Sequence, residues 1–160
     1  DRIITWTALS VPHLDAFGYS MRNDIAQIKK SEYIKFFNMP ILPEIYFKIF
    51  SYKNLKNIWR KSSESEIISY LETFKQRRAL KSALNWYRAN FKDNESTIGD
   101  ISIPTLIIYG MNDMAIDIKS VDNSEKYLKG RYKIEKLDSG HWLIQESFEE
   151  ISKSIIEHIN

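Results

Sequence analysis

The chain has 160 residues, 43% of them apolar and 28% charged, a composition that fits one globular domain with a sizeable core. Its 23 basic and 21 acidic residues are interspersed and leave a net charge of +2, so no single-sign field is available to hold nucleic acid. There is no cysteine, which excludes disulfides, thiolate zinc sites and a cysteine nucleophile. We expect a cytoplasmic protein that does not bind membranes, because no apolar run reaches the roughly 18 residues that span a bilayer and no signal peptide is recognisable.

The first segment, Asp1–Leu9, reads as a β-strand. Its run from Ile3 is apolar and β-branched on both faces, as in a central strand of a parallel sheet with neighbours on both sides. Only two further strands are predicted, Thr105–Tyr109 and Tyr132–Leu137. We therefore expect most of such a sheet to lie outside this chain.

Between Leu14 and about Asn94, apolar residues recur at spacings of three and four, which predicts helices. Pro40 and Pro43 break this pattern once, and the polar stretch Lys92–Asp100 ends it. The charged pairs Lys29-Lys30 and Arg77-Arg78 read as solvated helix faces.

The last part of the chain alternates strand, loop and helix, which is typical of parallel α/β architecture. Ser147 and Glu150 predict a capping box at the start of the final helix. The organisation is thus an α/β fold made of residues 1–13 and 96–160, with a helical block, residues 14–95, inserted after the first strand.

Polar residues follow two of the predicted strands. Gly110-Met111-Asn112-Asp113 comes after the second strand, and Gly140-His141-Trp142 after the third. Ligands bind beyond the carboxyl ends of such strands, where Asp113 and His141 can meet. An aspartate that accepts one ring N–H of a histidine leaves the other nitrogen free to act as a base. Taken alone, each residue is more often a turn or surface residue, but the order acid then histidine is that of α/β-hydrolases.

Four stretches strengthen this interpretation: Ser10–His13, Leu84–Ala89 (LNWYRA), Ile103–Asp113 and Gly140–Trp142. Together they resemble the C-terminal half of an α/β-hydrolase of the epoxide hydrolase and haloalkane dehalogenase group. The resemblance spans essentially the whole chain, and LNWYRA is its most specific part. It implies a partial α/β-hydrolase fold, with three parallel strands, flanking helices and a helical cap formed by residues 14–95.

The resemblance also implies roles for single residues. Asp113 would be the relay acid, His141 the base, and Tyr87 of the cap a donor to the oxygen that leaves an opening epoxide ring. Read without the resemblance, Tyr87 would be a core residue. Epoxide hydrolases usually bring a second cap tyrosine to the same oxygen; Phe36 takes its place here, and Tyr33 lies one helical turn earlier. Phe36, Tyr33 and Trp142 are expected to contact the substrate.

The nucleophile is not evident in the sequence. The five glycines frame neither a Gly-x-Ser-x-Gly elbow nor a comparable aspartate elbow. We expect the nucleophile to lie outside this chain, and the chain alone to be inactive. A truncated chain, one half of a split gene and a decayed relic all stay open as explanations.

The expected partners follow from this interpretation. They are a small apolar substrate (an epoxide, a halide or an ester) and the missing N-terminal half, as a covalent or separate partner; no cofactor is expected. Exposed sheet edges also favour self-association. An aspartate nucleophile would indicate an epoxide hydrolase or haloalkane dehalogenase, and a serine an esterase. The non-enzyme alternative is an interaction module that presents aromatic residues of the helical block, namely Phe47, Phe50, Tyr52 and Trp59.

Overall fold

The computed structural model describes residues 2–49, 51–90 and 97–160, and it forms two compact units. The first unit contains Asp1–Ser31 and Ser96–Asn160, and the second contains Glu32–Glu95. Phe50 and the first part of the predicted linker lie outside the described residues.

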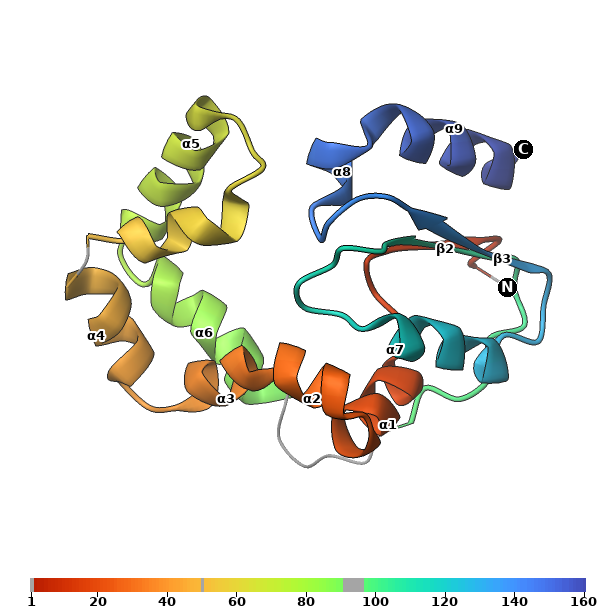
Figure 1. Cartoon of the computed structure of the whole chain (residues 1–160), viewed down its shortest axis with the longest axis horizontal. Helices are drawn as coiled ribbons and strands as arrows, with labels where there is room; N and C mark the ends of the chain where they lie inside the picture. The colour runs from red at the N-terminus through yellow and green to blue at the C-terminus, as the bar shows by residue number, and fades with distance from the viewer. Residues whose placement is uncertain (1, 50, 91–96) are drawn as a thin grey trace. The chain divides into compact units, whose positions relative to one another are not determined.

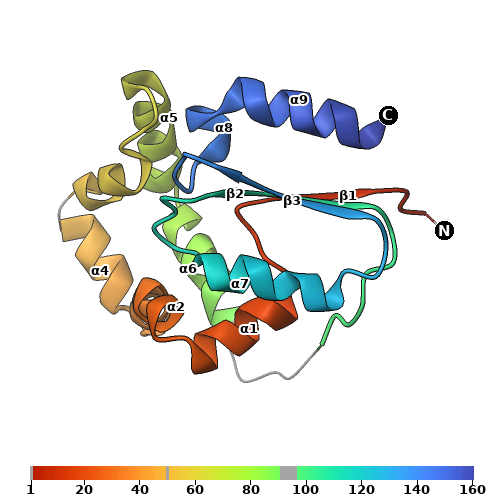
Figure 2. The same ribbon diagram turned by 45° about the vertical axis from the view of Figure 1, so that its right-hand side comes forward.

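The first unit is a parallel three-stranded sheet covered by helices on both faces. Its strands are β1 (Trp6–Leu9), β2 (Thr105–Gly110) and β3 (Tyr132–Leu137), in the order β1-β2-β3. Its helices are α1 (Leu14–Asn23), α2 (Ile25–Lys30), α7 (Ile118–Asp122), η2 (Asn123–Tyr127), α8 (Leu143–Glu146) and α9 (Phe148–Ile159). In Figures 1 and 2, α8 and α9 lie on one side of the sheet and α1 and α7 on the other.

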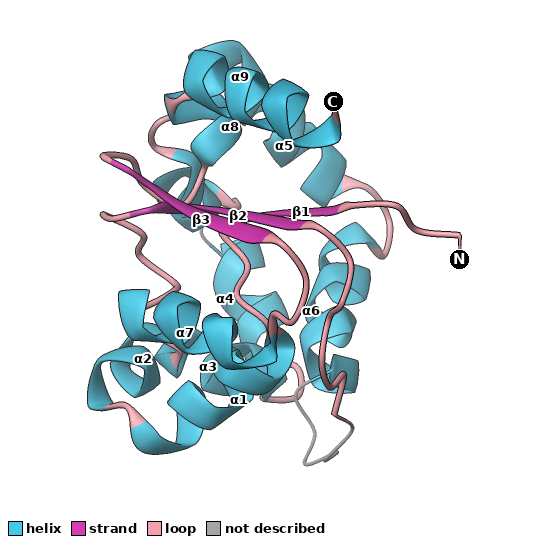
Figure 3. Ribbon diagram, turned by 90° about the vertical axis from the view of Figure 1, so that its right-hand side faces the viewer, coloured by secondary structure: helices cyan, strands magenta, loops and turns pink. Residues whose placement is uncertain are grey.

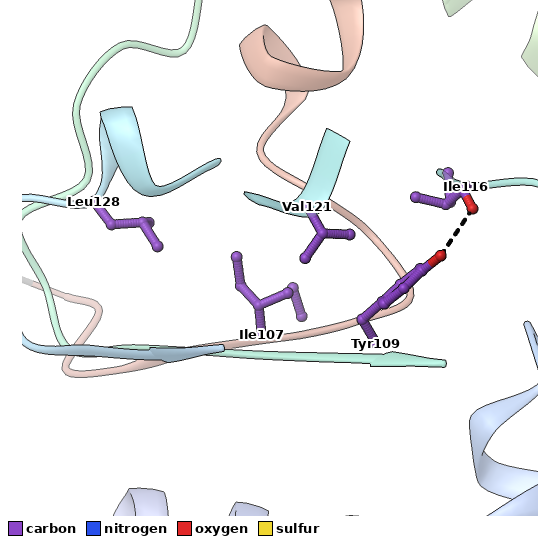
Figure 4. Close-up of a cluster of buried hydrophobic side chains, with 6 residues drawn as sticks. Ile107, Tyr109, Ile116, Val121 and Leu128 are labelled. Carbon is purple, nitrogen blue, oxygen red and sulfur yellow. Dashed lines mark hydrogen bonds between the residues drawn. The ribbon is translucent and has the colours of Figure 1, made fainter. Parts of the chain in front are cut away.

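The core follows from the two-residue period of β2, whose six residues are all buried. Ile107 and Tyr109 face α1 and α7, where they pack with Ile116, Val121 and Leu128 (Figure 4). On the opposite face, the buried residues are Leu106, Ile108, Leu143 and Ile151. Figure 3 shows this layered arrangement with the sheet seen edge-on. The predicted architecture is therefore correct: three parallel strands flanked by helices.

The first strand is shorter than predicted. It begins at Trp6, whose N–H donates to the carbonyl of Pro104, and Ile3 and Ile4 before it are 66% and 85% exposed. β2 starts only at Thr105, opposite Trp6, so the residues before Trp6 have no described strand to pair with. Of the three strands, β2 is the central one.

The helical block also begins later than predicted. The second unit starts at Glu32, whereas α1 and α2 belong to the sheet unit. α1 packs against α7 and η2, and Gln27 and Lys30 of α2 bind the loop after β2. Apolar periodicity predicts that these segments are helical, but it does not reveal which unit a helix packs against.

The second unit consists of short helices. They are α3 (Glu32–Asn38), α4 (Leu42–Ile49), η1 (Lys53–Trp59), α5 (Glu64–Lys75) and α6 (Ala79–Asn90). The break predicted at Pro40 and Pro43 separates α3 from α4. Phe47 and Trp59 are 5% and 9% exposed, so these aromatic residues pack within the unit and are not presented to a partner.

Helix capping differs from the sequence expectation. Ser147 precedes α9 as predicted, but its side chain makes no capping hydrogen bond. Its own N–H donates to the carbonyl of Leu143, because α8 runs almost directly into α9. A capping box is present at α5, where Ser63 and Glu66 bind each other's backbone N–H groups.

None of the helices in the described ranges is both long and apolar enough to cross a bilayer.

A bidentate ion pair connects α6 to α4 in the second unit. The guanidinium of Arg88 donates to both carboxylate oxygens of Glu44, at 2.7 and 3.0 Å, and to the carbonyl of Met39 at 2.7 Å. Both side chains are less than one-fifth exposed. The hydrogen bonds from Arg88 lower the pKa of the Glu44 carboxyl. This pair fixes the helix that carries LNWYRA.

We expect Arg88→Met to destabilise the chain by about 2 kcal/mol at pH 7, because it leaves a charged acceptor and a carbonyl without their donor. Glu44 has a lowered pKa when folded, so its stabilisation is present above its unfolded pKa and is lost as the pH falls through the folded pKa. The difference between parent and variant should therefore shrink below about pH 4. Urea unfolding between pH 3 and 7 measures this, and a difference independent of pH would contradict it.

Candidate active site

Two loops meet at the carboxyl ends of β2 and β3. The N–H of Met111 donates to the carbonyl of Leu137, and the N–H of Asn112 to that of Ser139, both at 2.9 Å. The backbones approach so closely that a Cβ on Gly110 would lie 2.2 Å from the carbonyl oxygen of Gly140. Only glycine allows this contact.

We expect Gly110→Ala to push the two loops apart and to destabilise the chain by about 2 kcal/mol, since the added Cβ would overlap backbone atoms of Ser139 and Gly140. Gly18→Ala is the matched control, because its added Cβ would meet only an arginine side chain at 3.6 Å. Urea unfolding measures the free energy of unfolding of both variants. Equal stability of the two variants would contradict the prediction.

Asp113 is 2% exposed, and both oxygens of its carboxylate accept hydrogen bonds. Oδ1 accepts the N–H groups of Ala115 and Ile116, at 2.7 and 2.9 Å. Oδ2 lies 2.8 Å from Nδ1 of His141. The structure thus brings together the predicted acid and the predicted histidine, within one unit.

The surroundings of His141 fix its backbone and leave part of the ring accessible. Its carbonyl accepts the hydroxyl of Ser10 at 3.1 Å, and the preceding N–H, of Gly140, donates to Glu146 at 3.0 Å. The side chain is 28% exposed, and its ring packs edge-on against Trp142, with centroids 5.1 Å apart. Since the Asp113 carboxylate accepts at Nδ1, this nitrogen carries the proton. Nε2 has no hydrogen-bond partner among the described residues.

His13 differs from His141 in having both ring nitrogens occupied. Nδ1 accepts the N–H of Asp15 at 3.2 Å, so Nε2 carries the proton and donates to the carbonyl of Gly99 at 2.9 Å. The ring is 1% exposed and stacks on Tyr127. His13 therefore fills a structural role at the start of α1.

Tyr109 of β2 binds the loop that follows this strand and carries Asp113. Its hydroxyl donates to the carbonyl of Ile116 at 3.1 Å (Figure 4). Burial raises the pKa of Tyr109 to about 12, with the charge of Asp113 acting in the same direction. Tyr109 is thus a neutral donor at physiological pH.

Tyr87, Tyr33 and Phe36 lie in the second unit. Burial raises the pKa of Tyr87, and a hydrogen bond with Tyr33 acts in the opposite direction. The rings of Tyr33 and Tyr87 are 6.0 Å apart, and Phe37 packs edge-on against both. Phe36 packs mainly with Tyr46 and its neighbours. The structure thus pairs Tyr87 with Tyr33.

Three residues around these groups were missed by the sequence reasoning: Gln27, Lys30 and Phe37. The amide of Gln27 and the ammonium of Lys30 bind the loop that carries Asp113, so Lys30 does not lie on a solvated face as predicted. The only feature of the sequence that points to a shared role of Gln27 and Lys30 is their spacing of three residues, which puts them on one face of a helix.

Among residues 2–49, 51–90 and 97–160, no group of three or more histidine, aspartate or glutamate side chains is placed to hold a metal ion.

Comparisons with known proteins bear on the family and the fold of the chain. The family described as "alpha/beta hydrolase fold" matches residues 14–148. The chain is 25% identical to "Epoxide hydrolase 3" of Xenopus tropicalis and 26% identical to "Epoxide hydrolase 4" of Homo sapiens, over 97% of this chain and 46% of each relative. It thus spans about half the length of these relatives. A crystal structure of a Bacillus megaterium epoxide hydrolase superposes with a TM-score of 0.83, at 20% identity, over 99% of this chain and 61% of that one.

Proposed function

The chain belongs to the α/β-hydrolase fold family, and we propose that it supplies the base, the relay acid and the proton-donating tyrosine of an epoxide hydrolase. The observation that carries the proposal is the contact between the buried Asp113 carboxylate and His141, 2.8 Å long, beyond the carboxyl ends of adjacent parallel strands. The curated relatives named as epoxide hydrolases support the choice of reaction.

In the first half of the proposed reaction, a carboxylate outside this chain attacks an epoxide carbon. A ring C–O bond breaks, and Tyr87 gives its proton to the leaving oxygen. A phenol is protonated at neutral pH and can donate here, and because burial raises the pKa of Tyr87 its proton is retained into the alkaline range. The product is an ester between substrate and enzyme.

In the second half, water attacks the carbonyl carbon of that ester. Nε2 of His141 takes a proton from the water, while Asp113 holds Nδ1–H and stabilises the imidazolium that forms. The single bond between the carbonyl carbon and the ester oxygen breaks. The diol leaves after that oxygen takes a proton from the imidazolium. The regenerated carboxylic acid releases the remaining proton, which restores Tyr87.

We assign the second phenol to Tyr33, although the family resemblance described under Sequence analysis places Phe36 at that position. The hydrogen bond with Tyr33, which lowers the pKa of Tyr87, supports this assignment, since Tyr33 then donates to Tyr87 and stabilises its oxygen as Tyr87 gives up its own proton. Phe36 and Trp142 are proposed as apolar contacts to the substrate. We further propose that the chain alone is inactive, because the nucleophile lies in the missing N-terminal half.

The test is to assemble this chain with a nucleophile-bearing N-terminal half and to measure epoxide hydrolysis. A single turnover in H₂¹⁸O should give an unlabelled diol, because the added oxygen comes from the enzyme carboxylate. Label in the first diol would overturn the ester mechanism. Ester cleavage without epoxide opening would indicate a serine nucleophile, and halide release a dehalogenase.

A further inference from the structure

Two side chains of α2 bind the loop that carries Asp113. We define residues 113–117 as the acid loop. We propose that Gln27 and Lys30 are positioning residues that hold the acid loop so that the Asp113 carboxylate points at His141, a role that rests on the proposed function of this pair as acid and base.

Gln27 uses its whole hydrogen-bonding capacity in this contact. It is 0% exposed, and its Nε2 donates to the carbonyl of Ala115 and to the hydroxyl of Ser31, both at 2.9 Å. Its Oε1 accepts the N–H of Asp117 at 2.7 Å and the hydroxyl of Ser120 at 2.8 Å. A carbonyl can only accept and an N–H can only donate, so the orientation of the amide is fixed.

Lys30 lies next to Gln27 on the same face of α2. Its Nζ donates to the carbonyl of Asp113 at 2.9 Å and to that of Ile116 at 2.7 Å, and lies 3.6 Å from the carboxylate of Asp117. Its side chain is 29% exposed. The ammonium thus bridges two backbone carbonyls, one of which belongs to Asp113 itself.

The geometry links these contacts to the chemistry. Oδ1 of Asp113 is bound to the N–H groups of Ala115 and Ile116, so the direction of the carboxylate follows the backbone of the acid loop. Without Lys30, the Asp113 carbonyl loses this donor, whereas the Ile116 carbonyl keeps the hydroxyl of Tyr109. Loss of the ammonium therefore frees the end of the loop that presents Oδ2 to His141.

The test uses Lys30→Met, which keeps the apolar stem and removes the ammonium. Lys29→Met is the matched control, because Lys29 is its exposed neighbour on the same helix. The readout is the pair of ¹⁵N shifts of the His141 ring in the full chain, which contains only three histidines. Assignment comes from the His141→Gln spectrum.

In the parent and in Lys29→Met, we expect one tautomer, protonated at Nδ1. In Lys30→Met, the two ring shifts should move toward each other as the tautomers mix, while amide signals of β2 and β3 stay in place. Gln27→Glu places an oxygen opposite the Ala115 carbonyl and should have the same effect. If Lys30→Met does not fold, Gln27→Glu decides the result. A single unchanged tautomer in the folded variants overturns the proposal.

A second readout is the rate of ester hydrolysis in the assembled enzyme. Lys30→Met should lower this rate about tenfold to a hundredfold and leave formation of the ester unchanged. Lys30→Arg, which keeps the positive donor, should recover part of the loss. Tautomer mixing without any epoxide hydrolysis by the parent would support the positioning role and reject the proposed function instead.

Discussion

Asp113→Asn is expected to lower kcat for epoxide hydrolysis by about four orders of magnitude, the size of effect seen when a relay acid holds a histidine in one tautomer. The amide is nearly isosteric, and its oxygen can keep the N–H groups of Ala115 and Ile116. Its NH₂ group then points at Nδ1 of His141 and donates to it. The ring proton moves to Nε2, the nitrogen that has to take a proton from water, so the base is disabled.

Asp113→Asn should slow hydrolysis of the ester and leave the rate of ester formation unchanged. Rapid mixing with excess epoxide should therefore show the alkylated enzyme accumulating in Asp113→Asn, detectable as added mass on the intact protein. Asp138→Asn is the control, because Asp138 is an exposed acid on the neighbouring loop and accepts a hydrogen bond from the side chain of Asn112. A normal hydrolysis rate in Asp113→Asn would remove Asp113 from the mechanism.

The sheet and the contact between acid and histidine follow from local sequence. Parallel strands place their carboxyl ends at one edge, so a polar loop after each of two adjacent strands suffices to bring Asp113 and His141 together. β3 has the predicted bounds, and β2 extends one residue further, to Gly110. These features depend on short-range patterns that apolar runs and turn residues encode.

Features that depend on packing between residues far apart in the chain could not be predicted from local sequence patterns. Lys30 reads as a surface lysine until the acid loop, more than eighty residues away in sequence, supplies its two carbonyls. The assignment of α1 and α2 to the sheet unit has the same origin. At Ser147, the predicted capping box does not form, because Ser147 follows the last residue of α8 and its N–H donates to the carbonyl of Leu143. The pairing of Tyr33 with Tyr87 likewise appears only when α3 packs against α6.

Tyr87→Phe is expected to slow ester formation by about a hundredfold, within the range for loss of a general acid. Tyr33→Phe should have a smaller effect, because Tyr87 can still donate its own proton. The double variant should lose about a thousandfold or more, since no phenol of the pair remains to protonate the leaving oxygen. Ester hydrolysis, which depends on His141, should be unaffected in all three variants.

The pH dependence of ester formation tests the same assignment, because the protonated phenol is the active form. Burial raises the pKa of Tyr87, so the rate in the parent should persist above the ordinary phenol pKa of about 10 and fall only at higher pH. In Tyr33→Phe, Tyr87 loses the hydrogen bond that lowers its pKa, and the alkaline limb should move further up. Tyr46→Phe, in the same aromatic cluster, is the control. An alkaline limb at the same pH in Tyr33→Phe and the parent would show that Tyr33 does not act on Tyr87 in the reaction.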